Sequence, residues 1–262
     1  MPPAPSTSAP PLKENIKKAY DSIASNYNEW TKPTHPIRIK HLNKLLDRLP
    51  DPKEGDDALA VLEVGCGGGE PVTSLLASAT TGPVSGSEIG KPKPRFRVFA
   101  NDISTAQLEA AAARLSAFKE NVEFRGGDMM GLSFEKGSLD AVIGMYSIIH
   151  LPREEQTVFL ERVYGWLKPG GFFLGNFGVG ELESGFNEDW LGCGRKGNGD
   201  GDGERGVMFW SGWGGEKTCE ILAGIGFEVV SREVVVDVEE DNGVEMEVPF
   251  MWVLARKGGT RD

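Results

Sequence analysis

The sequence predicts an α/β fold whose mostly parallel seven-stranded sheet ends in an antiparallel hairpin. Strand and helix patterns alternate from residue 58 to residue 177, which favours a parallel sheet covered by helices. A glycine-rich turn follows the first strand and leads into a helix. The last two strands, at 227–238 and 245–256, are separated by a short acidic turn, so they must pair antiparallel.

Two amphipathic helices are predicted before the first strand. The first spans residues 12–30, where apolar residues recur at helical spacing. The second begins near Pro36, a residue suited to the first turn of a helix, and ends near Leu49. The apolar face of the first helix is formed by Ile16, Tyr20, Ile23 and Tyr27.

Strands are predicted at residues 58–64, 95–102, 121–128, 139–146 and 171–177. The first and the fourth of them, ALAVLEV and LDAVIGMY, are almost continuously apolar. That pattern is typical of strands buried on both faces of a parallel sheet.

Helices are predicted between these strands and after them. The side chains of Ser104 and Gln107 have the spacing of a capping box. The run Lys168-Pro169-Gly170-Gly171 is predicted to end the helix before the fifth strand. The helices begin near Pro71, Ser104, Pro152 and Gly215.

Two segments have the composition of long loops. Residues 80–94 consist of turn and loop residues, and residues 192–215 contain ten glycines in 24 positions. We expect the second segment to contribute little to a packed core.

Charge and cysteine content exclude several classes of protein. The chain has 28 basic and 39 acidic residues, a formal net charge of −11, so a nucleic-acid partner is not expected. Its three cysteines are widely spaced, which argues against a disulfide framework and a zinc site, and no metal is expected. No apolar run approaches the roughly 18 residues of a membrane span. The proline-rich start resembles no signal peptide, so a cytoplasmic protein with a disordered leader is expected.

The glycine-rich turn is a candidate ligand loop. Gly65, Gly67 and Gly69 let the backbone turn sharply and approach a ligand closely below the start of the next helix. The dinucleotide fingerprint requires glycine where this chain has Glu70, and no Walker motif follows. The loop therefore suits an adenosine-containing ligand without a phosphate chain.

Two carboxylates follow the next two strands, where the carboxyl ends of parallel strands converge. Asp102 could accept hydrogen bonds from both ribose hydroxyls, and Asp128 could accept one from an adenine amine. Each residue alone could equally be a turn or cap residue. Their order on consecutive strands after the glycine turn favours a ligand site.

Taken in order, these segments resemble class I S-adenosylmethionine-dependent methyltransferases, in the small-molecule branch of ubiquinone-biosynthesis-type enzymes. The resemblance covers about residues 58–230 and implies a Rossmann-like class I methyltransferase fold with an N-terminal helical cap. It implies S-adenosylmethionine as cofactor and a small organic acceptor with an O, N, S or C nucleophile. The matching segments are VLEVGCGGG, NDISTAQLEAA, the Gly127-Asp128 pair, LDAVIGMYSIIHL, LERVYGWLKPGG and GFEVV.

The resemblance also implies roles for individual residues. Tyr27 would form a roof over the cofactor, although its helical spacing also suits a core residue. His150 would face the acceptor as a general base, or it would serve only to begin the following helix. The residues implied to bind the cofactor are Glu63, Gly65, Cys66, Gly67, Gly69, Asp102, Ile103, Asp128, Met129 and Met145.

Two further features have alternative interpretations. Residues 198–203 imitate the start of a calcium loop, but Phe209 stands where its final glutamate would be, so a solvated loop is favoured. The run VMFWSGW, residues 207–213, could line an apolar acceptor pocket or anchor the glycine-rich loop.

Together these patterns predict one enzyme domain with additions. Its function would be methyl transfer, and the alternative is a methyltransferase-like cofactor-binding or regulatory protein without turnover. The oligomeric state stays open. The predicted parts are a disordered leader (1–11), a helical cap (12–57), a cofactor-binding core (58–177), a Gly-rich insertion (178–215) and a closing helix with hairpin (216–258).

Overall fold

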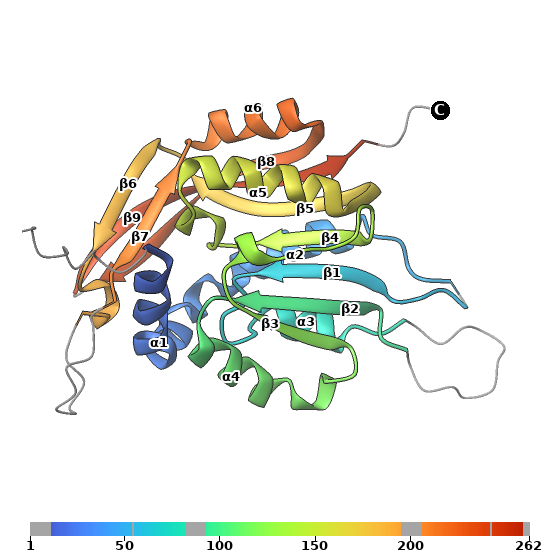
Figure 1. Cartoon of the computed structure of the whole chain (residues 1–262), viewed down its shortest axis with the longest axis horizontal. Coiled ribbons are helices and arrows are strands. Elements are labelled where there is room, and N and C mark those ends of the chain that lie inside the picture. Colours follow the sequence, from blue (N-terminus) through green and yellow to red (C-terminus); the bar gives the residue numbers. More distant parts are fainter. Residues whose placement is uncertain (1–11, 54, 82–92, 195–205, 242, 259–262) are drawn as a thin grey trace, which may run out of the picture.

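The computed structural model describes residues 12–53, 55–81, 93–194, 206–241 and 243–258 (Figure 1). The leader predicted for residues 1–11 lies outside the described residues, as do most of the 80–94 loop and the calcium-like stretch at 198–203.

A seven-stranded sheet forms the centre of the molecule, in the order β3-β2-β1-β4-β5-β9-β8. The first five strands along the chain pair in parallel, whereas β9 pairs antiparallel with both β5 and β8. This confirms the predicted fold class. The strands are β1 (Leu59–Val64), β2 (Phe96–Asp102), β3 (Val122–Gly126), β4 (Leu139–Gly144), β5 (Leu167–Gly178), β8 (Phe227–Asp241) and β9 (Val244–Lys257).

Helices cover both faces of this sheet (Figure 1). Leu42 of α2 and Leu76 of α3 are fully buried in one core cluster, against one face. Phe159 of α5 and Leu222 of α6 are fully buried in a second cluster, against the other face. The α-helices are α1 (Leu12–Trp30), α2 (His35–Leu46), α3 (Val72–Ser78), α4 (Thr105–Arg114), α5 (Arg153–Trp166) and α6 (Gly215–Ile225). Short 3₁₀ turns are η1 (Lys32–Thr34), η2 (Ser116–Phe118), η3 (Met129–Gly131), η4 (Ile148–His150) and η5 (Trp190–Gly192).

The run of residues 168–171 does not separate helix from strand as predicted. Strand β5 begins directly after α5, and Leu167 already pairs with Leu139 of β4. The glycines fit because the neighbouring backbone is close: a Cβ at Gly171 would lie 3.0 Å from the carbonyl oxygen of Asp140. Sheet pairing therefore outweighs the local preference of this run for a turn.

The predicted capping box at α4 is only half formed. The Ser104 hydroxyl accepts from the Gln107 N–H (3.1 Å), as predicted. The reciprocal bond is replaced because the Asp102 carboxylate accepts from the Ser104 N–H (2.9 Å). The Gln107 amide donates instead to the carbonyl of Ala24 in α1 (3.4 Å).

A small second sheet was not predicted from the sequence. Strands β6 (Leu182–Asn187) and β7 (Met208–Gly212) pair antiparallel. Met208 and Phe209 are buried against α1, so the expectation that residues 192–215 contribute little to a core is wrong at this end. A glycine permits the approach, since a Cβ at Gly206 would lie 2.2 Å from the Ala19 nitrogen.

The two N-terminal helices lie in different places. Figure 1 shows α1 beside the carboxyl ends of β1 and β2, next to the β6–β7 sheet. Helix α2 instead packs against the main sheet, where the His41 ring stacks on Trp252 at 4.2 Å between centroids. Of the segment predicted as a cap, α1 is therefore the part that lies over the strand ends.

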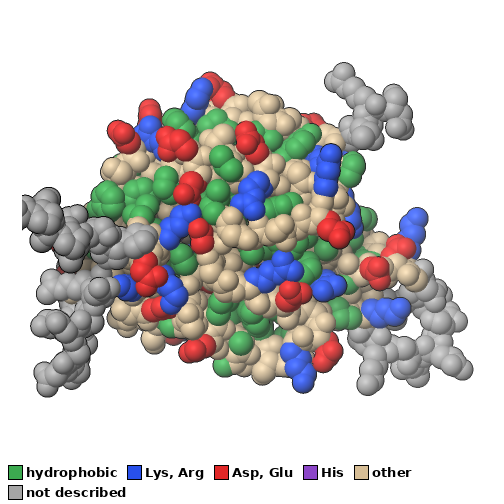
Figure 2. Space-filling model, in the orientation of Figure 1, with side chains coloured by type: hydrophobic (Ala, Val, Ile, Leu, Met, Phe, Trp, Pro, Cys, Tyr) green, Lys and Arg blue, Asp and Glu red, His purple; other side chains and the backbone are tan. Residues whose placement is uncertain are grey.

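Acidic and basic side chains are interspersed on the face shown in Figure 2. Exposed ion pairs of the structure include Lys217 with Glu220 (2.9 Å) and Arg232 with Glu216 (2.6 Å). Pairs of this kind typically contribute about 0–1 kcal/mol each, so the fold depends mainly on its buried apolar clusters.

Candidate functional site

The glycine turn after β1 lies at the carboxyl end of the sheet. Gly65 and Gly67 have φ angles of 73° and 53°, a region that favours glycine. A Cβ at Gly65 would lie 2.3 Å from the Cβ of Ser147, so the protein itself requires glycine there. At Gly67 a Cβ would meet only the Gln107 side chain, at 4.0 Å. The space in front of Gly67 is therefore open to a ligand.

Asp102 holds this turn in place. Its two carboxylate oxygens accept from the N–H groups of Gly67 (2.8 Å) and Ser104 (2.9 Å). The side chain is buried, and burial raises the pKa of Asp102 to about 6 although these hydrogen bonds oppose the rise. Each carboxylate oxygen keeps a further lone pair that can accept from a ligand hydroxyl.

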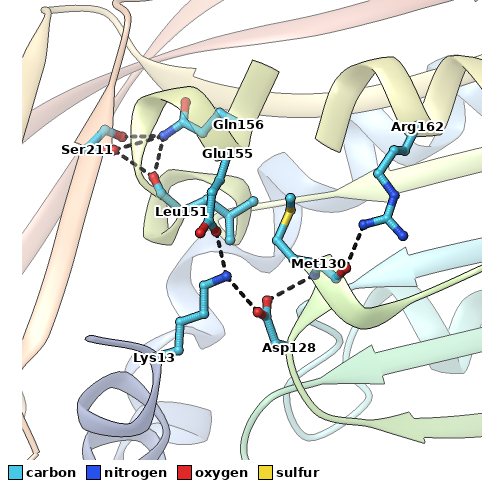
Figure 3. A network of polar contacts seen from close by, with 8 residues as sticks. All are labelled: Lys13, Asp128, Met130, Leu151, Glu155, Gln156, Arg162 and Ser211. Atoms are coloured by element: carbon cyan, nitrogen blue, oxygen red, sulfur yellow. Dashed lines mark hydrogen bonds and ion pairs between the residues drawn. The ribbon is translucent and has the colours of Figure 1, made fainter. Parts of the chain in front are cut away.

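Asp128 belongs to a polar network that ties α1 to the sheet (Figure 3). One carboxylate oxygen accepts from the Met130 N–H (2.9 Å), and the other accepts from the Lys13 ammonium (2.6 Å). Lys13 also pairs with Glu155 at the start of α5 (2.5 Å). Burial lowers the pKa of Lys13, but its two acidic partners outweigh burial and the pKa is raised. Lys13 thus connects α1 to the turn after β3 and to the start of α5.

These groups line a first cavity with about 620 Å³ of empty space, which opens to solvent. Two aromatic side chains predicted to take part in catalysis, Tyr27 and His150, also line it. Of the predicted cofactor residues, the cavity brings together Gly65, Gly67, Asp102, Ile103, Asp128 and Met129.

The other four predicted cofactor residues lie outside this lining and pack behind it. Glu63 accepts from the Thr73 hydroxyl (2.5 Å), and burial raises its pKa to about 7. Cys66 and Met145 are buried in the core cluster that contains α2 and α3. Gly69 faces α4, where a Cβ would lie 3.0 Å from a methyl group of Leu115.

Several lining residues were not predicted as site residues. Lys13 and Tyr20 come from α1, and their helical spacing with Tyr27 places them on the side of α1 that faces the cavity. Asn101 precedes Asp102 and donates to the carbonyls of Arg125 (2.8 Å) and Gly127 (2.9 Å). In the sequence, Lys13 and Tyr20 lie in the same predicted helix as Tyr27, and Asn101 directly precedes Asp102. These relations to predicted site residues could have indicated the three residues.

A second cavity adjoins the first and has about 1140 Å³ of empty space, including open solvent. It lies between α1, the β6–β7 sheet and the β8–β9 hairpin. The Trp30 indole N–H donates to the carbonyl of Glu240 (2.8 Å), which joins the end of α1 to the hairpin. The two cavities share the side chains of Tyr20, Tyr27, Tyr146 and His150.

His150 is hydrogen-bonded through both ring nitrogens. Nδ1 lies 2.6 Å from the carbonyl oxygen of Phe209, which can only accept, so Nδ1 carries the proton. Nε2 then accepts from the Tyr20 hydroxyl (2.8 Å). Burial lowers the pKa of His150 to about 4, so the ring is neutral at pH 7.

The residues of the VMFWSGW run are divided between the wall of a cavity and a buried anchor. Trp210 lines the second cavity. Met208 and Phe209 are buried beside α1 and anchor the segment. Trp213 donates to the carbonyl of Arg153 (2.9 Å) and packs under the guanidinium of that residue.

The described residues contain no group of three or more His, Cys, Asp or Glu side chains that could hold a metal ion. Among the helices in the described ranges, none is both long and apolar enough to cross a membrane.

Comparisons with known sequences identify a domain in this chain. Residues 61–171 match the family model described as a methyltransferase domain. The chain is 32% identical over 165 residues to demethylmenaquinone methyltransferase of Lactococcus lactis subsp. lactis (strain IL1403), covering 61% of this chain and 56% of the relative. It is 31% identical over 149 residues to methyltransferase GfsG of Streptomyces halstedii, covering 56% and 48%. The chain thus spans about half the length of these curated relatives.

Solved structures share the fold at low sequence identity. A DhpI–SAH complex matches with a TM-score of 0.60 and 20% identity, over 96% of this chain and 99% of the other. Magnesium protoporphyrin IX methyltransferase ChlM from Synechocystis PCC 6803, with bound SAM, matches with a TM-score of 0.55 and 15% identity, over 97% and 100%. The [4+2]-cyclase SpnF matches with a TM-score of 0.60 and 17% identity, over 96% and 98%. The fold is therefore the Rossmann-like fold of S-adenosylmethionine-dependent methyltransferases.

Proposed function

Because residues 61–171 form a class I methyltransferase domain, we propose that the protein transfers a methyl group from S-adenosylmethionine to a small organic acceptor. The accepting atom would be an O, N, S or C nucleophile. One observation carries the proposal. A cavity built from the glycine turn and two carboxylates adjoins an aromatic cavity, and they share one wall.

The residues of the first cavity fit the cofactor. Asp102 would accept from the ribose hydroxyls, and Asp128 would accept from the adenine amine after Lys13 gives up part of its contact. Gly67 leaves space that any side chain would fill. When bound, S-adenosylmethionine supplies a methyl group that is already activated for displacement.

The protein then mainly aligns the acceptor and excludes water. Tyr20 and Tyr27 pack edge to face, with their ring centroids 5.1 Å apart, and both line the shared wall. Their electron-rich faces favour a neighbouring cation. A neutral His150 adds no positive charge to this wall, and it holds the Tyr20 hydroxyl in place.

The lining of the second cavity supports a small-molecule acceptor. It is rich in aromatic side chains, as suits an apolar ligand oriented by a few polar groups. Among the relatives, demethylmenaquinone methyltransferase is named for a small organic acceptor.

The second candidate function is cofactor binding without methyl transfer. It is favoured by the structural match to SpnF, which is described as a [4+2]-cyclase. The same fold therefore also occurs in a protein that is named for a cyclisation and not for methyl transfer.

Calorimetric titration with S-adenosylmethionine and S-adenosylhomocysteine, followed by a methyl-transfer assay on a library of small acceptors, tests both candidates. Binding of both ligands with a methylated product supports the proposal. Binding without any product favours the second candidate, and absence of binding contradicts both.

A further inference from the structure

We propose that the second cavity takes an aromatic carboxylic acid, whose carboxylate is held by the guanidinium of Arg38. The inference rests on the proposed function and names the class of acceptor. The carboxylate would be the anchor of the ligand, and its flat body would extend towards the wall shared with the first cavity.

Arg38 is a buried arginine with unused donors. It lies in α2, is 9% exposed and lines the second cavity. Its Nε donates to the Thr34 hydroxyl (3.2 Å). Within the described part of the chain, its terminal nitrogens donate no hydrogen bond, and no carboxylate lies within 4.0 Å of them. Since Arg38 lines the cavity, these nitrogens can donate to an acceptor on a ligand there, although the positive charge also acts on Asp237, whose pKa it lowers against the effect of burial.

The orientation of this guanidinium suits a carboxylate. Its Cζ lies 4.5 Å from the centroid of the Tyr146 ring, which covers one face. The Thr34 hydroxyl occupies Nε, so the donors left for a ligand are the two terminal nitrogens, which lie side by side in the planar guanidinium. This pair matches the two oxygens of a carboxylate in a bidentate contact.

The remaining walls suit a flat apolar body. Trp190 and Trp210 meet edge to face with centroids 5.5 Å apart, and Trp190 packs in the same way on Trp30 (5.5 Å). Phe250 of β9 closes the opposite side, beside Tyr146. Aromatic rings favour stacked or edge-to-face contacts with another ring.

Two acidic side chains, one in the cavity lining and one bonded to a lining residue, define the competing possibility. The Asp237 carboxylate accepts from the Tyr146 hydroxyl (2.6 Å) and is buried. Glu239 lines the cavity. If these acids determined the ligand, an aromatic cation would bind in place of an acid.

Three ligands of the same shape separate these possibilities. The protein is first saturated with S-adenosylhomocysteine, and 2-naphthoate, 2-naphthamide and 2-naphthylmethylammonium are then titrated by calorimetry. We expect the carboxylate to bind at least about tenfold more tightly than the neutral amide, the effect of a charge-assisted contact. Equal or tighter binding of the amide or the ammonium ion overturns the inference.

Variants then assign the effect to the residue. Arg38→Met should lose at least about tenfold in 2-naphthoate affinity but change 2-naphthamide affinity less than about threefold. Arg48→Met, in the exposed turn that follows α2, is the matched control and should change neither. If Arg38→Met does not fold, Thr34→Val should weaken only the carboxylate, because it releases the Nε anchor. A carboxylate preference that survives both Arg38→Met and Thr34→Val contradicts the inference.

The saturation step separates this inference from the proposed function. Failure to bind S-adenosylhomocysteine contradicts the proposed function. Normal binding of S-adenosylhomocysteine without a carboxylate preference contradicts only the assignment of the acceptor class.

Discussion

Asp102 combines two tasks in one buried carboxylate. It already holds the glycine turn through two N–H groups, and we propose that it also accepts from the ribose hydroxyls. Burial raises its pKa to about 6, so its charge changes within an accessible pH range.

We therefore expect cofactor affinity to fall as the pH decreases from 7.5 to 5. Hydroxyl donors stabilise the ionised carboxylate, so binding lowers the pKa of Asp102 and is strongest above about pH 6. Calorimetry with S-adenosylhomocysteine across this range measures the effect. The pKa of Glu63 is raised to about 7, so this residue also titrates between pH 5 and 7.5. The variant Asp102→Asn is therefore the control that assigns the pH dependence to Asp102. That variant should bind at least about tenfold more weakly at pH 7.5 and lose most of the pH dependence. An unchanged profile would remove Asp102 from the site.

Gly67 and Cys66 are neighbours with opposite sensitivity to substitution. Gly67→Val should abolish cofactor binding, because the side chain would occupy the cavity and the φ of 53° disfavours a branched residue. Cys66→Ser should keep binding, since Cys66 is buried behind the cavity and its Sγ lies 3.6 Å from a carbonyl that a hydroxyl could use. Melting temperature and calorimetry on both variants check this. Binding by Gly67→Val together with loss in Cys66→Ser would reverse the assignment of space to Gly67.

His150 is expected to act as a positioning residue for Tyr20. His150→Ala leaves the Tyr20 hydroxyl and the Phe209 carbonyl without their partner, so turnover and melting temperature should both fall. His150→Asn can replace one of these bonds and should restore part of both. With a pKa of about 4, His150 should cause no change in rate between pH 6 and 8. Equal loss of turnover in both variants, at unchanged melting temperature, would instead support the general base that the sequence resemblance implied.

At the scale of elements, α1 is fastened at both ends. Lys13 joins its first turn to Asp128 and Glu155, and Trp30 joins its last turn to the β8–β9 hairpin. Between these points, Ile16, Ala19 and Ile23 pack on the β7 side. The helix can therefore close both cavities together.

Lys13→Met is expected to accelerate cofactor release several-fold, because it removes two ion pairs that hold α1 over the first cavity. The equilibrium affinity should change less, since Asp128 gains a free oxygen for the ligand. Stopped-flow displacement of bound S-adenosylmethionine measures the rate. Lys32→Met, which removes an exposed pair with Glu29, is the control and should leave it unchanged. Release at the normal rate in Lys13→Met would show that the ion pairs do not hold the helix closed.

At the scale of the whole molecule, α1 and the main sheet belong to separate buried clusters. The buried residues of α1 belong to a cluster with Trp190, Met208 and Phe209. The clusters on the two faces of the main sheet do not contain them.

A chain that lacks residues 1–30 should therefore keep its main sheet but lose turnover. Cofactor affinity should fall less than turnover, because Asp102 and the glycine turn remain while both cavities open to water. Circular dichroism, calorimetry and a turnover assay test these three parts. Full turnover in the truncated chain would mean that the acceptor is held without α1.

The sequence alone determined the main architecture and the first half of the site. Continuous apolar runs such as residues 58–64 are typical of strands buried on both faces of a parallel sheet. The short turn between the last two strands requires those two to pair antiparallel. Gly65, Gly67, Asp102 and Asp128 follow consecutive strands, so topology brings them to one cavity whatever their side chains contact.

Only the tertiary structure decided the contacts between segments far apart in the chain. Arg38 faces the second cavity, Lys13 meets Asp128, and His150 is closed between Tyr20 and the Phe209 carbonyl. The residues that meet in these contacts are far apart along the chain, so no local sequence pattern could reveal them. Sequence periodicity reports which side of an element is buried, whereas the partner it meets depends on how the elements pack.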